Sequence, residues 1–100
     1  MADLEQLAGL TAEHFEARMD RKARISANGE TMDLAIATVT RLNHGTRDGG
    51  AFSVLFDGPP TPMVDQGLHE VEIEGDAALA LFLVPVYQDE TGTRYEAVFT

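Results

Sequence analysis

One uncharged apolar run, residues 77–86 (AALALFLVPV), constrains the fold of this chain most strongly. Ten residues are too few to span a bilayer as a helix. The β-branched and aromatic residues and the proline within the run favour a strand over a helix. Side chains alternate between the two faces of a strand, and both faces of this run are apolar. We therefore expect a central strand covered on both faces, in a β-sandwich or a small closed barrel.

Other segments alternate between apolar and polar residues and predict further strands. Asn28-Gly29, a pair typical of type I′ turns, is expected to join a strand that begins near Arg21 to a long strand over 31–42. Three more strands are expected at 51–57, 68–74 and 94–100. The side chains expected to face the core are those of Ala23, Ile25, Phe52, Val54, Phe56, Tyr95, Ala97 and Phe99. In the long strand one face is expected to carry Met32, Leu34, Ile36, Thr38, Thr40 and Leu42, and in 68–74 one face is expected to carry His69, Val71 and Ile73.

Two short helical turns are expected before the strands, at 3–7 and 11–15. Thr11 is suited to cap the second turn, because its hydroxyl can accept a hydrogen bond from an exposed backbone N–H. The apolar residues of both turns, among them Leu10 and Phe15, are expected to plug one end of the β core. The chain is thus predicted to be a single β domain over 1–100: a small antiparallel barrel or sandwich of six to seven strands with a short N-terminal helix.

A proline-rich loop is expected over 58–67. Its prolines cannot donate to a strand ladder and favour a rigid, extended backbone. The loop also contains two apolar residues, which either tuck over the end of the barrel or form an exposed contact. The candidate interaction residues of this loop are Pro59, Pro60, Pro62, Met63 and Val64.

The charge balance disfavours several partners. Seventeen acidic and seven basic residues give a net charge of −10, which would repel a nucleic-acid backbone and an anionic membrane surface. We therefore expect neither nucleic-acid binding nor membrane insertion. Most of the excess lies in residues 51–100, where nine acids accompany one base, Arg94. Four of the seven bases fall in 18–24, and they form either a docking patch or pairs with the protein's own acids, the second being favoured.

The chain has no cysteine, which excludes disulfides, thiolate metal sites and a cysteine nucleophile. Its first residues carry acids where a signal peptide needs a basic start and an apolar run. We therefore expect no cleavable signal, and synthesis in the cytoplasm.

No pattern of catalytic or metal-binding residues stands out. The three histidines, His14, His44 and His69, lack the short spacing of zinc ligands. The carboxylates of Glu70, Glu72 and Glu74 are spaced along one strand face, and Asp76 and Asp57 would have to join them to bind calcium. Ser26 and Ser53 lack the glycines of a nucleophile elbow. We expect no enzyme activity, no cofactor and no metal.

Five segments resemble a known family. These are LTAEHF (10–15), AFSVLFDGP (51–59), DQG (65–67), LFLVPV (81–86) and RYEAVF (94–99), and together they resemble DUF6916, a bacterial family of about 100 residues with no established activity. Near 19–23 the chain departs from the family pattern, with Asp20 and Ala23 where a glycine and an aromatic residue are expected. The resemblance implies that related proteins are encoded beside tail-collar-like proteins, which suggests an accessory part of a phage-tail-like or surface-fibre system.

Three functions are therefore open. The first is a structural or interaction module that uses sheet edges or the 59–67 loop to bind a protein partner or a second copy of itself. The second is a small-ligand barrel with its pocket near Phe52, Phe56 and Met63. The third is an enzyme that uses Asp57, Asp65 and His69, and we consider it the weakest.

Overall fold

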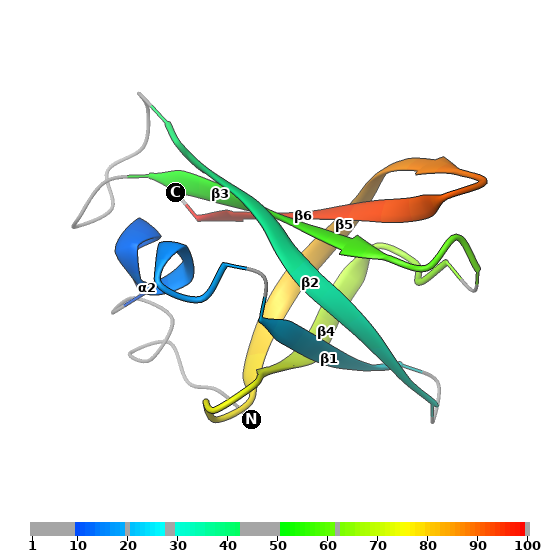
Figure 1. Cartoon of the computed structure of the whole chain (residues 1–100), viewed down its shortest axis with the longest axis horizontal. Coiled ribbons are helices and arrows are strands. Elements are labelled where there is room, and N and C mark those ends of the chain that lie inside the picture. The colour runs from blue at the N-terminus through cyan, green and yellow to red at the C-terminus, as the bar shows by residue number, and fades with distance from the viewer. Residues whose placement is uncertain (1–9, 20, 28–29, 43–50, 62, 100) are drawn as a thin grey trace.

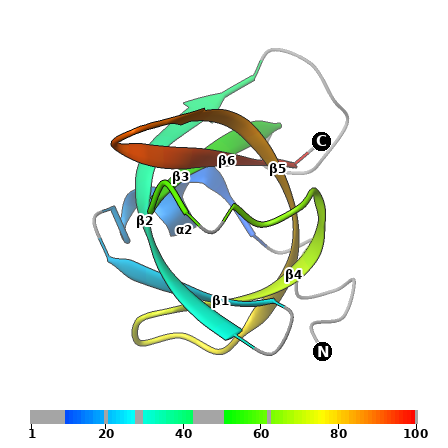
Figure 2. The same ribbon diagram turned by 90° about the vertical axis from the view of Figure 1, so that its right-hand side faces the viewer.

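Six antiparallel strands close into a barrel in the order β1-β2-β3-β6-β5-β4 (Figures 1 and 2). The structure is a computed structural model and describes residues 10–19, 21–27, 30–42, 51–61 and 63–99. The barrel closes because β1 pairs with β4 as well as with β2. The elements are α2 (Ala12–Glu16), β1 (Lys22–Ala27), β2 (Glu30–Arg41), β3 (Phe52–Gly58), β4 (Gly67–Ile73), β5 (Leu79–Asp89) and β6 (Gly92–Phe99). The prediction of a mainly β, antiparallel fold of six to seven strands with a short N-terminal helix is confirmed, and of the two predicted architectures the structure shows the barrel.

Tight turns join three of the strand pairs. The β1–β2 hairpin pairs Ala27 with Glu30, as predicted, although Asn28-Gly29 itself lies outside the described residues. In the turn between β4 and β5, Gly75 has a φ of +90°, a conformation that side-chain-bearing residues rarely adopt. Only two residues separate β5 from β6, because β5 runs to Asp89 and Asp89 pairs with Gly92 at the start of β6.

The core is made by the inward faces of all six strands and by α2. The largest fully buried side chains include those of Tyr95, Phe15, Phe52 and Phe56. Phe52 stacks on Phe99 with 4.6 Å between the ring centroids. The inward directions predicted for β1, β3 and β6 are therefore confirmed, with Phe99 only half-buried. The predicted alternation of β4 is also confirmed: Val71 and Ile73 are buried, His69 is half-buried, and Leu68, Glu70 and Glu72 are exposed.

The predicted faces of β2 are wrong beyond Ile36. Leu34 and Ile36 are buried, but Thr38 and Thr40 are exposed. The register between β2 and β3 shifts between Ile36 and Thr38, so one extra residue stands in β2. Such a bulge moves every later side chain to the other face, and Val39 packs against the core instead.

The prediction that the strand over 77–86 is covered on both faces is also wrong. On β5, Leu79, Leu81 and Leu83 are buried, whereas Phe82 is 52% exposed and Val86 is 49% exposed. The reason is the architecture: each strand of a closed barrel presents one face to the interior and the other to the outside, and no second layer of described residues covers the outer face of β5. The register shift after Pro85 agrees with a bulge at this proline.

The short helix α2 covers one end of the barrel, seen behind the ring of strands in Figure 2. Thr11 caps it as predicted, since its hydroxyl accepts a hydrogen bond from the His14 N–H at 3.2 Å. Phe15 is fully buried and contacts the rings of Phe52 and Phe99. The helical turn expected at 3–7 lies outside the described residues.

Two groups of ion pairs attach α2 and the residues that follow it to the strands and the β4–β5 turn. The guanidinium of Arg18 binds both carboxylate oxygens of Asp76, at 2.5 and 3.1 Å, in the β4–β5 turn. Arg41 at the end of β2 contacts Glu16 at 2.7 Å and Glu13 at 3.1 Å. The helix is thus fixed by charge pairs at its rim as well as by its buried phenylalanine.

Candidate functional site

Exposed apolar side chains are concentrated on three neighbouring strands. Seven large apolar side chains of the described residues are exposed, and five of them lie on β4, β5 and β6. We call this set the apolar outer face, and it comprises Leu68, Phe82, Val86, Tyr87 and Val98.

The strand register brings the apolar outer face together. Leu68 of β4 is paired directly with Phe82 of β5. On the other side of β5, Val84 is paired with Glu96 of β6. Phe82 precedes Val84 by two residues and Val98 follows Glu96 by two, so both point to the same outer side as that pair. Apolar side chains therefore extend across three adjacent strands.

Carboxylates border this face. Glu70 is paired with Ala80 on β5, two residues from Leu68. Glu96 stands between Val84 of β5 and Leu55 of β3. Neither glutamate forms an ion pair with another residue in the part of the chain that the structure describes. The border of the apolar outer face is therefore acidic, and no ion pair with a described residue neutralises its two glutamates.

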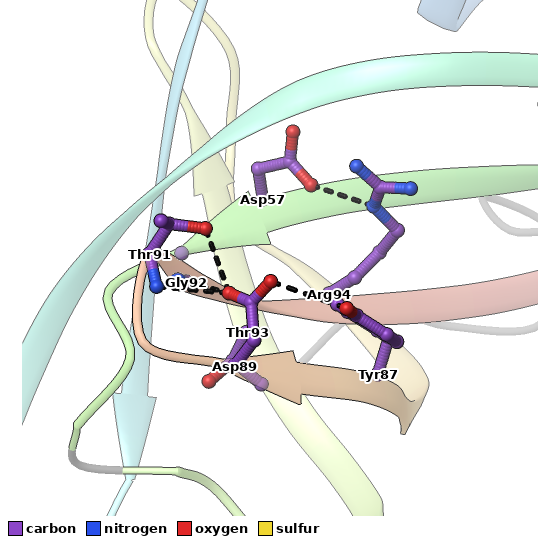
Figure 3. A pocket seen from close by; sticks show the side chains of 8 residues that line it. Asp57, Tyr87, Asp89, Thr91, Gly92, Thr93 and Arg94 are labelled. Carbon is purple, nitrogen blue, oxygen red and sulfur yellow. Dashed lines mark hydrogen bonds and ion pairs between the residues drawn. The ribbon is translucent and has the colours of Figure 1, made fainter.

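A hollow of about 190 Å³ lies where β3 meets the β5–β6 hairpin (Figure 3). Three residues in one cross-strand row line it: Tyr87 is paired with Arg94, and Arg94 with Asp57. The Arg94 Nε donates to Asp57 Oδ1 at 2.9 Å. Tyr87 is 59% exposed, and it is the member of the apolar outer face that lines the hollow, five residues along β5 from Phe82.

Asp89 forms the far wall of the hollow and is held in place by the hairpin turn. Its Oδ1 accepts hydrogen bonds from the Thr91 hydroxyl at 2.7 Å, the Thr91 N–H at 2.8 Å and the Gly92 N–H at 3.1 Å. The Tyr87 hydroxyl donates to Oδ2 at 3.2 Å. These donors, the Thr91 hydroxyl first, lower the pKa of the Asp89 carboxyl below its ordinary value of 3.8. Asp89 is thus anionic at neutral pH.

The candidate interaction loop is partly tucked against the barrel. The backbone carbonyl of Pro60 accepts a hydrogen bond from Gln88 Nε2 at 2.5 Å, and the Val64 N–H donates to the Tyr95 hydroxyl oxygen at 2.9 Å. Val64 packs against the core, whereas Met63 is 45% exposed. Pro59 and Pro60 are half-buried, and Pro62 lies outside the described residues. The loop is anchored to β5, beside the apolar outer face.

The three residues considered for catalysis do not converge. Asp57 points outward on β3 and binds Arg94. His69 is on β4, three strands away around the barrel in either direction, and its Nε2 donates to the Asp65 backbone carbonyl at 2.8 Å. The structure therefore assembles no acid–imidazole set from Asp57, Asp65 and His69.

The remaining histidines and carboxylates are also apart. His14 is half-buried on α2, and its Nε2 is buried without a hydrogen-bond partner among the described residues. Desolvation, together with the charge of Arg18, lowers the pKa of His14 below 6.5. No group of three histidine, aspartate or glutamate side chains in the described ranges could hold a metal ion, and His44 lies outside those ranges.

Two of the four bases in 18–24 form ion pairs with the protein's own acids. Arg18 binds Asp76, and the Arg24 Nε lies 3.5 Å from Asp33 Oδ1. Lys22 and Arg24 point outward from β1, between the glutamates of β4 and Asp33 of β2, as Arg24 is paired with both Glu72 and Asp33. The preferred interpretation, internal charge pairing, is confirmed for Arg18 and Arg24.

The apolar outer face was not identified as a site from the sequence. Leu68 shares the outward face of β4 with Glu70 and Glu72, and a leucine among glutamates was the available signal. Phe82 gave none, because an apolar residue inside an apolar run is equally compatible with burial.

The comparisons with known proteins give a family and nothing further. The model of DUF6916, described as a domain of unknown function, matches residues 10–99. Searches of curated proteins and of solved structures returned no match. Within the described residues, none of the helices has the length and apolar character needed to cross a membrane.

Proposed function

The chain belongs to the DUF6916 family, a domain of unknown function, and we propose that it is a non-enzymatic structural or assembly module that binds a protein partner through the apolar outer face. The chain is made in the cytoplasm in this proposal. In this proposal the protein serves as an accessory component of a phage-tail-like or surface-fibre system. The support for this role is the genomic association that the family resemblance implies.

The observation that carries the proposal is the directly paired and exposed couple Leu68 and Phe82. Single exposed apolar residues are normal on soluble proteins, but a continuous apolar surface over three strands typically marks an interaction site. Tyr87, a member of this face, is paired with Arg94, and aromatic residues and arginine are enriched at the centres of protein interfaces. The barrel closes, so binding here uses the strand faces and not the sheet edges.

The alternative function is a small-ligand barrel. It requires room near Phe52, Phe56 and Met63. Phe52 and Phe56 are 1% and 0% exposed and pack in the core, so the present side-chain arrangement favours the outer face over the interior.

Site-specific photocrosslinking in the organism that encodes this chain tests the proposal. A benzophenone amino acid replaces Phe82 in one variant and Asp33 in a control variant, whose exposed side chain lies on β2, three strands away around the barrel. We expect one discrete protein adduct from position 82 and not from position 33. The absence of an adduct at 82, or the same adducts at both positions, would contradict the proposal.

A further inference from the structure

We propose that the partner is a basic protein that covers the apolar outer face with an apolar centre and inserts one lysine or arginine side chain into the hollow beside Tyr87. This inference rests on the proposed function and adds the chemistry of the partner. It follows from the charges at the border of the face and from the groups that line the hollow.

The first observation is that carboxylates border the apolar outer face. Glu70 and Glu96 are beside the apolar outer face and have no ion-pair partner among the described residues. A partner that covers the face removes water from these carboxylates, and a carboxylate that loses water without gaining a cation is costly. A second copy of this chain would bring another charge of −10 and the same two glutamates. The face therefore fits a different protein, one with cations around an apolar patch.

The hollow has the chemistry to receive such a cation. Two carboxylates, Asp57 and Asp89, line it together with one guanidinium, that of Arg94. Asp57 uses Oδ1 for Arg94, as Figure 3 shows, and none of the described residues donates a hydrogen bond to its Oδ2. The 59% exposed ring of Tyr87 adds an aromatic face on which an ammonium or guanidinium group can lie.

The size of the hollow is consistent with one long side chain. The hollow has a volume of about 190 Å³ and is open to solvent on one side. An anionic side chain would fit less well, because Arg94 is already paired with Asp57 and a further carboxylate would meet Asp57 and Asp89. The same sign argument excludes an anionic lipid surface as the occupant.

The test uses a displayed library of random linear peptides, selected against the whole purified chain. We expect the selected peptides to combine apolar residues with lysine or arginine, and to lose binding when Phe82→Thr removes the apolar centre. With one such peptide in solution, Asp57→Asn combined with Glu96→Gln should weaken binding by about 10-fold or more, and raising the salt should weaken it further. Tyr87→Ser should also weaken it.

The matched control is Asp33→Asn. It also removes a carboxylate from an exposed ion pair, that with Arg24, but on β2, away from the face. Its affinity for the peptide should equal that of the wild type. Peptides that need Phe82 but lack basic residues, or equal losses for the control and the hollow variants, would overturn this inference and leave the proposed function intact. A selection without any Phe82-dependent peptide would contradict both.

Discussion

Leu68 and Phe82 lie opposite each other across the β4–β5 pair, with both side chains outside the barrel and 63% and 52% exposed. Directly opposed side chains on one face of an antiparallel pair are in contact range. Their neighbours Leu81 and Leu83 are 2% and 1% exposed in the core. The same strand therefore supplies the core with one face and an apolar surface with the other, and substitutions on the two faces should have different effects.

Substitution on the outer face should leave stability almost unchanged. Phe82→Thr places a β-branched residue, which suits a strand, on the outer face and should change the free energy of unfolding by less than about 1 kcal/mol. Leu83→Ala, one residue further along, should lower it by about 2–5 kcal/mol because it leaves a cavity in the core. Urea denaturation of both variants checks this prediction. Equal losses would show that Phe82 serves folding rather than binding.

Removing the Tyr95 hydroxyl should loosen the proline-rich loop. The Val64 N–H donates to this hydroxyl at 2.9 Å, and Tyr95 is fully buried. Tyr95→Phe keeps the ring but takes away the acceptor, so the free energy of unfolding should fall by about 1–2 kcal/mol. Amide hydrogen exchange should speed up at Val64 and not at Val71 in β4. Unchanged exchange at Val64 would mean that this hydrogen bond does not hold the loop.

Gly92 should not tolerate a side chain. A Cβ at this position would lie 2.8 Å from the backbone carbonyl oxygen of Gly58, closer than real Cβ contacts, and backbone cannot move aside as a side-chain tip can. Gly92→Ala should therefore lower the free energy of unfolding by about 1–3 kcal/mol and distort the hollow. Gly67→Ala is the control, since its Cβ would approach no atom more closely than 3.9 Å. Thermal melts of the two variants compare them.

His14 should make the protein less stable on mild acidification. Burial lowers the pKa of His14 in the folded chain below its ordinary value of 6.5, so the unfolded chain binds a proton first as the pH falls. Stability is then fully present above about pH 6.5 and is lost as the pH drops from there toward the folded pKa. Urea midpoints of the wild type and His14→Leu between pH 8 and 5 check this: the decline should be smaller in the variant. Parallel declines would assign the effect to other groups.

The contribution of Asp76 to the stability of the fold should be lost at a lower pH than that of His14. The hydrogen bonds from Arg18 lower the pKa of the Asp76 carboxyl below 3.8, so the pair stabilises the fold above that value. The contribution is lost as the pH falls from about 3.8 through the folded pKa. Asp76→Asn should be less stable than the wild type at pH 6, and the difference should narrow at the acid end of the titration. A difference that does not change with pH would argue against the ion pair as its source.

Local sequence patterns predicted most of the strands. They did not distinguish the closed barrel from a β-sandwich. Ala23 and Ile73 are paired across the closure and are 50 residues apart in the chain, so no local alternation reports their contact. The bulge after Ile36 also has no clear local signal, yet one extra residue reverses the faces of Thr38 and Thr40.

The apolar outer face was missed for a related reason. A strand that is apolar on both sides looks the same whether a second layer covers it or solvent does. Only the ring of strand pairings shows that nothing in the described chain covers Phe82.

The most direct measurement is the affinity of the protein crosslinked from position 82, once purified, for the wild-type chain and for the Leu68→Thr/Phe82→Thr variant. Removal of two central contacts should weaken binding by about 100-fold or more, with unfolding midpoints close to those of the wild type. Isothermal titration calorimetry gives both affinities. Equal affinity of two folded chains would contradict the proposal that this protein binds its partner through the outer face of β4, β5 and β6.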